Sequence, residues 1–399
     1  MKFLFPLFLC TLLVYADANA QVTIRKSGDE KTRIDWSGFG SDGSPAAREF
    51  ITTLQRALVR SGWFLGVEAG RGEVTLTGRV ARQGETLRAE CVVVGSVTQR
   101  AYLNHAYGGR ADQPRQLAFQ VADAITKAVT GNPGMAAARL ALVGTRTGHK
   151  ELYLAASDGG DLVQLTRDNS ISLSPIWGPG GRIAYTSYRR GGPDVFLIDV
   201  QTGQRQPIAA YPGLNTGGAI SPDGRDMALI LSKDGSTELY VKNIASGRLT
   251  RLTTPSRAAL ASPSWSPDGR QIVFVSDQSG RPQLYTIARD GGRPQRLTSR
   301  GVENVSPHWG ANGRIAFASR VGGRYQIAVI DPATRDVQYL QTGDGADYEE
   351  PSWAPNGRHI ACTRTINRQS KVYLLDTLGD PAIALTDHAG DWMSPSWSQ

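Results

Sequence analysis

The sequence predicts a mostly β protein, a six-bladed β-propeller with a split closing blade, preceded by a small α/β domain. Two observations predict this fold. First, a motif that begins with tryptophan, replaced once by isoleucine, recurs along the chain at Trp177, Ile220, Trp265, Trp309, Trp353 and Trp397. The intervals are 43, 45, 44, 44 and 44 residues, and periods of this length are typical of solenoids or propeller blades. Second, the content of each period indicates strands.

The period that begins at Trp265 shows this content. The turn sequence Ser-Pro-Asp-Gly-Arg at 266–270 is followed by β-rich runs at 271–276 and 283–288, and Gly and Pro residues separate these runs. Ser-Pro-Asp-Gly suits a tight turn, because Pro fixes φ and Gly supplies a positive φ. Four short antiparallel strands make a propeller blade, whereas a helical repeat needs a 3.6-residue periodicity that the period lacks.

The number of blades follows from how the ring closes. Residues 139–168 contain three strand-like runs with no tryptophan run before them, and residues 394–398 form a tryptophan run with no strand-like run after it. If these two parts share a blade, five continuous blades and one split blade make six. Closure of this kind leaves no open sheet edge in the ring.

The segment before the repeats divides into two parts. Residues 1–20 predict a signal peptide, because a basic start and an apolar run precede the small-residue cleavage site Ala18-Asn19-Ala20. A membrane anchor needs roughly 20 apolar residues and this run is shorter. Phe8 and Leu9 before Cys10 disfavour a lipid-attachment site. We therefore expect an exported protein without a membrane span.

Residues 21–133 predict the α/β domain, and residues 134–399 the propeller. The domain should contain a short strand at 22–24, a helix from Pro45 to about Gly62, a hairpin of strands 73–80 and 86–96, and a helix at about 114–129. The apolar residues of both predicted helices recur on one face, as expected for helices that pack on a sheet.

Composition excludes several classes of protein. The chain is 40% hydrophobic and 20% charged, with a net charge of +8. Because the basic residues are spread evenly and do not form a stripe, we expect no nucleic-acid partner. Cys91 and Cys362 lie in different domains within apolar strands, which predicts buried thiols and no disulfide framework.

Catalytic motifs are absent from the sequence. It has no nucleophile elbow, no zinc-protease helix motif and no phosphate loop. The first strand of each blade should line the channel with mostly small residues, and Glu350 and His308 are the exceptions. One Glu and one His are too few for a catalytic metal site, so we predict no catalytic, cofactor or metal residues.

The connections between blades are the predicted interaction surface, because they lie together on one side of the disc, opposite the Ser-Pro-Asp-Gly turns. They combine aromatic residues with both charges, a composition typical of protein-binding surfaces. The predicted partner-binding residues are Arg257, Glu303, Asn304, His308, Asp347, Tyr348, Glu349, Glu350, Asp391 and Trp392. We expect the protein to be a monomer.

With these features together, the chain resembles the TolB family of the Tol-Pal envelope system. The residues that carry the resemblance are 266–270, 276–285 and 291–298, combined with the export signal, the preceding α/β domain and the split blade. The resemblance covers nearly all of the chain after residue 20.

The resemblance implies a non-catalytic adaptor in the periplasm. Its propeller would bind a Pal-like peptidoglycan-associated lipoprotein on the inter-blade loops, in a system that supports outer-membrane integrity and invagination during cell division. Its N-terminal segment would bind a TolA-like inner-membrane protein, which implies a role for Gln21, Val22, Thr23, Ile24 and Arg25. The segment before Trp36 is shorter and more basic than the resemblance implies.

Two other classes remain open from the residues alone. A propeller enzyme would hold a metal ion in the channel, between acidic and imidazole ligands. A carbohydrate-binding propeller would use aromatic residues of the same inter-blade loops to bind peptidoglycan.

Overall fold

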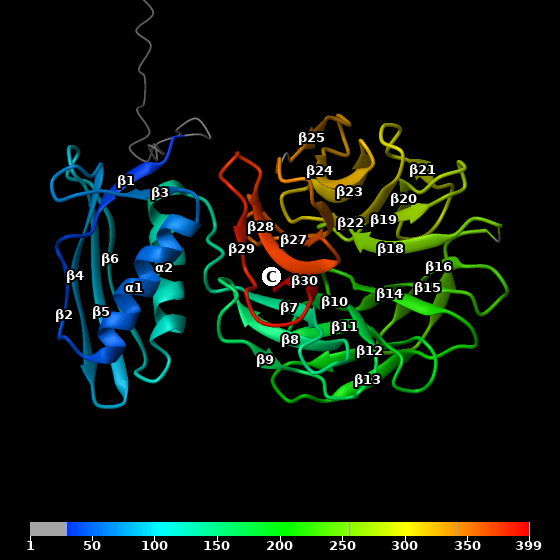
Figure 1. The fold of residues 1–399 in the computed structure, drawn as a ribbon, viewed down its shortest axis with the longest axis horizontal. Coiled ribbons are helices and arrows are strands. Elements are labelled where there is room, and N and C mark those ends of the chain that lie inside the picture. Colours follow the sequence, from blue (N-terminus) through cyan, green and yellow to red (C-terminus); the bar gives the residue numbers. More distant parts are fainter. Residues whose placement is uncertain (1–29, 255, 341, 399) are drawn as a thin grey trace, which may run out of the picture.

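A computed structural model of the chain describes residues 30–254, 256–340 and 342–398, and it consists of an α/β domain beside a propeller (Figure 1). The predicted signal peptide, the predicted strand at 22–24 and the predicted partner segment at 21–25 lie outside the described residues. Within the described residues, neither helix is long and apolar enough to cross a membrane.

The α/β domain is a six-stranded sheet with two helices packed on one face. The sheet has the order β3-β1-β4-β5-β6, and β2 pairs with β4. In Figure 1 the helices lie between the sheet and the propeller, so the other face of the sheet points away from the propeller. The elements are β1 (Thr32–Asp35), β2 (Phe39–Ser41), α1 (Pro45–Arg60), β3 (Phe64–Gly66), β4 (Val74–Gln83), β5 (Thr86–Gly95), β6 (Ala101–Arg110) and α2 (Pro114–Thr130).

The two helices begin and end at residues that cap them. Ser44 precedes α1, and its hydroxyl accepts a hydrogen bond from the Ala47 N–H. Gly131 follows α2 with φ of 75°, a left-handed conformation that favours glycine. Both helices bury an apolar face, with Phe50 and Leu58 in α1 and Val121 in α2 fully buried. The predicted helices are confirmed.

The propeller consists of six four-stranded antiparallel sheets, each ordered from the channel outward. Blades 1 to 5 are continuous in sequence. Their strands are β10 (Ser172–Gly178), β11 (Arg182–Ser187), β12 (Asp194–Asp199) and β13 (Arg205–Ala209); β14 (Asn215–Ile220), β15 (Asp226–Leu231), β16 (Glu238–Asn243) and β17 (Leu249–Arg251); β18 (Leu260–Trp265), β19 (Gln271–Ser276), β20 (Gln283–Ala288) and β21 (Gln295–Arg296); β22 (Asn304–Trp309), β23 (Ile315–Val321), β24 (Arg324–Ile330) and β25 (Val337–Tyr339); β26 (Asp347–Trp353), β27 (His359–Ile366), β28 (Gln369–Asp376) and β29 (Ile383–Ala384).

Blade 6 is the split blade, in the order β30-β7-β8-β9. Its innermost strand β30 (Trp392–Trp397) comes from the end of the described chain and pairs with β7 (Arg139–Gly144), which is followed by β8 (Glu151–Ala156) and β9 (Val163–Gln164). The Ser398 hydroxyl accepts a hydrogen bond from the Arg139 N–H at 2.8 Å, which extends this pairing past the strand. The predicted six-bladed ring with a split closing blade is confirmed.

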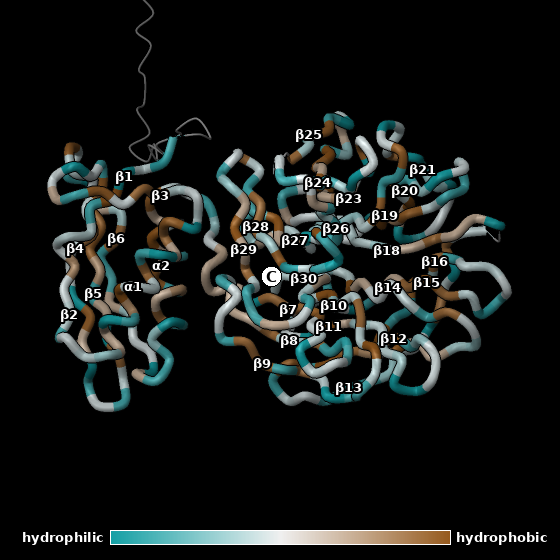
Figure 2. Tube along the Cα trace, viewed as in Figure 1, coloured by the Kyte–Doolittle hydropathy of each residue, from teal (hydrophilic) through white to brown (hydrophobic). Residues whose placement is uncertain are grey.

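The apolar core of the propeller lies between adjacent blades. One cluster combines Leu140 and Trp392 of blade 6 with Ala361 and Leu374 of blade 5, and similar clusters fill the other junctions. Figure 2 shows the same distribution, with hydrophobic residues along the strands and hydrophilic residues in many connections. Each blade therefore needs a neighbour on both sides to bury its faces.

Each innermost strand carries one β-bulge at the same place in the repeat. In blade 3 the pairing shifts between Ala261 and Ser264, and Ser262 has φ of 48°. The equivalent residues also have positive φ, at Ser174, Gly217, Ser306, Glu350 and Ser394. Since all of these residues except Gly217 carry a side chain, the surrounding ring must stabilise this conformation.

The domains meet where α1 and α2 contact blades 5 and 6. The Arg358 guanidinium of blade 5 lies 4.5 Å from the Trp63 ring centroid and 2.6 Å from the Asp376 carboxylate. The Arg115 guanidinium at the start of α2 lies 2.8 Å from the Asp158 carboxylate of blade 6. A cleft of about 520 Å³ lies beside the first contact, and both apolar residues, such as Val59, and charged residues, such as Asp380, line it.

Candidate functional site

The side of the propeller that carries the inter-blade connections is called here the inter-blade face. It also carries the hairpins between the second and third strands of each blade. The connection and the hairpin are hydrogen-bonded to each other: the Tyr188 N–H donates to the Ile171 carbonyl at 2.9 Å, and the Val302 N–H donates to the Arg320 carbonyl at 3.2 Å. In these two blades the connection and the hairpin therefore form one ordered pair of loops on the inter-blade face.

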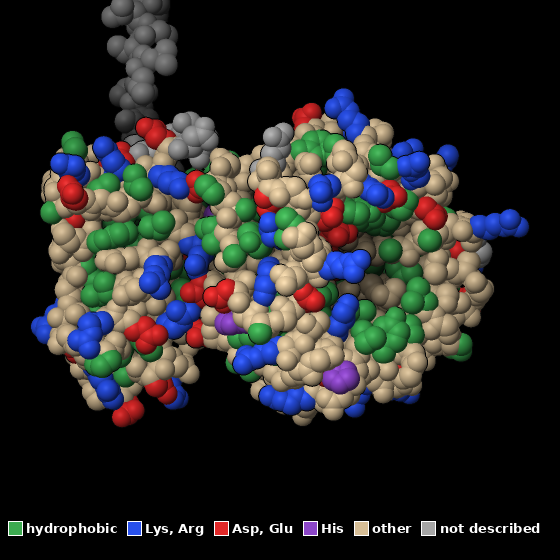
Figure 3. Space-filling view, in the orientation of Figure 1, with side chains coloured by type: hydrophobic (Ala, Val, Ile, Leu, Met, Phe, Trp, Pro, Cys, Tyr) green, Lys and Arg blue, Asp and Glu red, His purple; other side chains and the backbone are tan. Residues whose placement is uncertain are grey.

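Exposed apolar side chains lie on this face at blades 1 and 4. Ile171 and Tyr188 are 44% and 36% exposed, and Val302 and Val321 are 45% and 39% exposed. Arg257 is also exposed, as predicted. Figure 3 shows a hollow on the propeller bordered by hydrophobic, basic and acidic side chains. These four residues were not among the predicted contact residues: Ile171 and Val302 are aliphatic residues of connections, and Tyr188 and Val321 lie in hairpins, for which the sequence made no prediction.

Polar contacts order the loops around Val302. The Glu303 carboxylate accepts a hydrogen bond from the Tyr325 hydroxyl at 2.6 Å and lies 3.6 Å from the Arg320 guanidinium. The bond from Tyr325, together with the charge of Arg320, lowers the pKa of Glu303. This predicted residue therefore presents a fixed negative charge beside Val302 and Val321.

Tyr348 and Trp392 were predicted to be partner-binding residues at the surface, and this prediction of exposure is wrong. Tyr348 is 1% exposed and Trp392 is fully buried. The Tyr348 hydroxyl donates to Asp344 at 2.8 Å, and burial raises its pKa to about 12 with help from that bond. The Trp392 ring packs edge-on against Tyr153 at 4.9 Å. Both residues stabilise the propeller core and offer no surface to a partner.

Asn304 and Asp391 are also occupied by internal contacts. Asn304 is fully buried, and its amide donates to the Gln283 side chain at 2.8 Å and to the Arg300 carbonyl at 2.7 Å. Asp391 is half-buried, and its carboxylate accepts from the Ser370 N–H at 2.9 Å. Asn304 therefore stabilises its own loop and is not available to contact a partner. Asp391 links the connection that leads to blade 6 with a strand of blade 5.

The repeat explains this burial. Tyr348, Trp392 and Asn304 each stand five residues before the motif position of their blade. The residues in this position are buried in all six blades, and the other three are Ser172, Asn215 and Leu260. Because alternate residues of a strand point to opposite faces, this position points between blades in every repeat. Superposition of the repeats was the signal that would have shown it.

His308 lies in the channel, away from the inter-blade face, so its predicted place among the partner-binding loops is wrong. It stands just before Trp309, at the end of β22 that leads to the turn, and lines a cavity of about 160 Å³ together with turn residues such as Pro222 and Pro267. Its Nδ1 accepts a hydrogen bond from the Trp353 N–H at 2.9 Å. Burial lowers the pKa of His308 to about 4, which keeps the ring neutral.

This bond belongs to a repeated contact between neighbouring blades. In the same position, the hydroxyls of Ser264, Ser352 and Ser396 accept the backbone N–H of the next blade's tryptophan, at 3.0 to 3.1 Å. His308 therefore replaces a serine as an acceptor that joins blade 4 to blade 5.

The acidic residues at the start of blade 5 have different environments. The Glu350 carboxylate accepts from the Thr363 hydroxyl at 2.7 Å and from the Ser394 N–H at 2.9 Å, so it joins blade 5 to blade 6. The Asp347 carboxylate accepts from the Tyr325 N–H at 2.8 Å. Burial raises the pKa of Glu349, and the negative charges of Glu350 and Asp347 raise it further.

The remaining reactive groups are isolated from one another. Among the residues that the structure describes, no three His, Cys, Asp or Glu side chains gather where they could hold a metal ion. Cys91 and Cys362 are free, buried thiols, and burial raises the pKa of Cys91 to about 12. Thiolate chemistry at Cys91 is therefore disfavoured near neutral pH.

Comparison with known proteins adds the family. Residues 126–399 match the model of the TolB beta propeller domain. The chain is 34% identical over 185 residues to the Tol-Pal system protein TolB of Desulfosudis oleivorans, covering 46% of this chain and 42% of that protein. It is 28% identical over 258 residues to the Tol-Pal system protein TolB of Alcanivorax borkumensis, covering 57% of this chain and 58% of that protein. These matches span less than two thirds of the relatives' own lengths.

A solved structure extends the similarity to both domains. TolB from Acinetobacter baumannii superimposes with a TM-score of 0.82 at 26% identity, covering 93% of this chain and 97% of that one.

The fold and the inter-blade face define a class of protein: a closed six-bladed propeller with an attached α/β domain and inter-blade loops that carry apolar and charged side chains. Within that class, the chain belongs to the TolB β-propeller family.

Proposed function

We propose that this protein is a non-catalytic periplasmic adaptor of a Tol-Pal system, and that its inter-blade face binds a Pal-like peptidoglycan-associated lipoprotein. Membership of the TolB family supports the system. The observation that carries the surface is the cluster of Val302, Val321, Glu303 and Arg320, which combines exposed apolar area with an ordered ion pair. Apolar contacts within a charged rim are typical of protein interfaces.

An adaptor role also fits the state of the polar groups in the channel. Glu350 is hydrogen-bonded to Thr363 and Ser394, and His308 is neutral and accepts a backbone N–H. Neither side chain is free to act as a general base without breaking a contact between blades. The burial of Tyr348 and Trp392 also makes both of these predicted aromatic residues inaccessible to a carbohydrate ligand.

In this proposal the outer-membrane role belongs to the assembled system. Binding of the lipoprotein would link this protein to peptidoglycan, and the segment Gln21–Arg25 would bind a TolA-like inner-membrane protein. The system would thereby support outer-membrane integrity and invagination during cell division.

A binding assay with the soluble domain of a Pal-like lipoprotein tests the surface. Val302→Asp combined with Val321→Asp should weaken binding about tenfold or more, because each change places a charge where apolar area should be buried. The control is Arg270→Asp, which changes an exposed residue of the opposite, turn-bearing face. Equal binding by wild type and the Val302/Val321 variant would contradict the surface assignment.

A further inference from the structure

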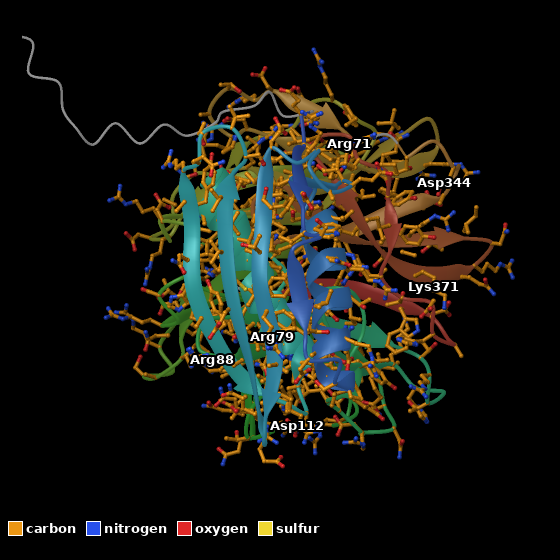
Figure 4. All side chains as sticks on the ribbon, turned by 90° about the vertical axis from the view of Figure 1, so that its left-hand side faces the viewer. Arg71, Arg79, Arg88, Asp112, Asp344 and Lys371 are labelled. Carbon is orange, nitrogen blue, oxygen red and sulfur yellow. The ribbon has the colours of Figure 1, made fainter. Side chains whose placement is uncertain are left out.

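The α/β domain has an open sheet edge at β6 (Ala101–Arg110). Among the described residues, β6 pairs only with β5, and the opposite edge of the sheet is the short strand β3. Asn104, Ala106 and Gly108 are all exposed. Figure 4 shows the outer face of this sheet, with Arg79 and Arg88 on it, and no further strand beyond β6. The propeller lies behind the helices, so it does not cover this edge.

The pairing with β5 shows which backbone groups point outward. In an antiparallel pair, hydrogen-bonded and non-hydrogen-bonded residue pairs alternate. The Ala111 N–H donates to the carbonyl of Glu85, the residue directly opposite, at 2.9 Å. Every second pair from there is therefore also hydrogen-bonded: Leu87 with Gly109, Ala89 with Tyr107, and Cys91 with His105. The N–H and C=O groups of Asn104, Ala106 and Gly108 therefore point away from β5.

This edge lacks the usual protection against pairing. Natural edge strands carry proline, inward charges, lysines or bulges that prevent another strand from joining. β6 contains no proline and only one charged residue, Arg110 at its end, and its pairing irregularity lies at the other end, opposite Val93 and Val94. From Leu103 to Gly109 the strand is regular and uncharged, and Gly108, whose Cβ position has nothing within 4 Å, permits close approach of another backbone.

The side chains beside the edge indicate the chemistry of a partner. On the outer face, Arg88 lies opposite Gly108, and Arg110 follows two residues later. Gly108 has no side chain, so both guanidinium groups can reach a strand that pairs with β6. Their present contacts, with Glu90 at 3.1 Å and Asp112 at 2.6 Å, are exposed ion pairs of the kind that contribute little stability and exchange readily.

The inner face of the edge is more apolar. Leu103 and Tyr107 are half-buried against the domain core, and the His105 and Tyr107 rings pack edge-on at 4.7 Å. A strand added beside them could bury β-branched side chains against these groups. A strand that pairs with β6 should therefore alternate acidic residues, which would face the outer side, with apolar residues, which would face the inner side.

We propose that the β6 edge binds an extended, acidic segment of a partner protein, which adds an antiparallel strand to the sheet. The segment alternates carboxylate residues, directed at Arg88 and Arg110, with β-branched apolar residues, directed at Leu103 and Tyr107. Its backbone pairs with Asn104, Ala106 and Gly108, the mode of recognition known as strand addition. This surface is independent of the inter-blade face and of the segment Gln21–Arg25, and it would give the protein a third partner.

Fluorescence anisotropy with a short labelled peptide of alternating glutamate and valine tests the proposal. Ala106→Pro removes an outward N–H and leaves every bond to β5 in place, so it should weaken binding about tenfold or more without lowering the melting temperature. Ala106→Thr is the matched control, because it keeps the N–H and should retain binding. The corresponding lysine–valine peptide should bind less tightly than the glutamate peptide.

Three results would overturn the proposal. The first is no binding of the glutamate peptide to wild type, and the second is equal binding by wild type and a folded Ala106→Pro variant. The third is self-association of the wild type, measured by analytical ultracentrifugation, that Ala106→Pro abolishes, since a second copy would then be the occupant of the edge. Protection of the Ala106 amide from hydrogen exchange by the peptide would support the proposal directly.

Discussion

Substitution of Trp392 by alanine should destabilise the propeller, although the residue stands at the edge of an inter-blade connection. The ring is fully buried and packs on Tyr153 and directly against Gly144, where an added Cβ would lie 2.4 Å from a ring carbon. Its Nε1 donates to the His388 and Ala389 carbonyls, both at 3.2 Å. A buried Trp→Ala change costs about 3–5 kcal/mol.

This cost predicts a measurable change in melting temperature. At about 2–4 °C for each kcal/mol, Trp392→Ala should melt about 6–20 °C below wild type in circular dichroism or calorimetry. Trp392→Phe is the matched control, because it keeps an aromatic ring in the core and loses only the Nε1 hydrogen bonds and the volume of the five-membered ring, so it should cost less than Trp392→Ala. If Trp392→Ala melts at the wild-type temperature but no longer binds the partner, the burial argument is contradicted and Trp392 is a partner-binding residue at the surface.

Three further predictions concern closure, the turns and pH. Removal of residues 394–399 should weaken or abolish cooperative unfolding, because it deletes most of β30; an unchanged transition would refute the closure. Gly269→Val should cost about 1 kcal/mol or more, because φ there is 67°, and should leave partner binding intact; loss of binding by the folded variant would place the interface on the turn-bearing face. For His308, the folded pKa of about 4 lies below the ordinary 6.5, so stability should be constant above pH 6.5 and fall by up to about 3 kcal/mol toward pH 4. Urea unfolding of wild type and His308→Ser at pH 7.5 and pH 4.5 checks this, and equal pH dependence in the two proteins would refute it.

The sequence predicted the propeller because its blades repeat. A tryptophan, or isoleucine at position 220, every 43 to 45 residues and the Ser-Pro-Asp-Gly turns indicated the number of blades, and the incomplete repeats at 139–168 and 394–398 indicated the closure. The structure confirms that Gly224, Gly269, Gly313 and Gly357 all have positive φ. The turn residues and the length of the repeat were sufficient to predict the propeller, because every blade makes the same kinds of contact.

The candidate site was less predictable because its exposure depends on strand register. Tyr348 and Trp392 follow polar connections in the sequence, yet the strand begins there and turns both side chains between the blades. The strand β6 was also missed, because Gly108, Gly109 and the exposed polar residues of an edge strand do not alternate as those of a half-buried strand do. The burial of Tyr348 and Trp392 and the formation of β6 both depend on which strands and blades lie side by side, and a single sequence does not show this.

Hydrogen exchange of the protein with and without the soluble domain of a Pal-like lipoprotein tests the central claim most directly. The account predicts slower amide exchange at 300–304 and 320–324 on the inter-blade face, including Val302 and Val321, and unchanged exchange in the turn at 266–270. Protection confined to that turn, or no protection anywhere in the propeller, would contradict the claim that the inter-blade face binds this partner.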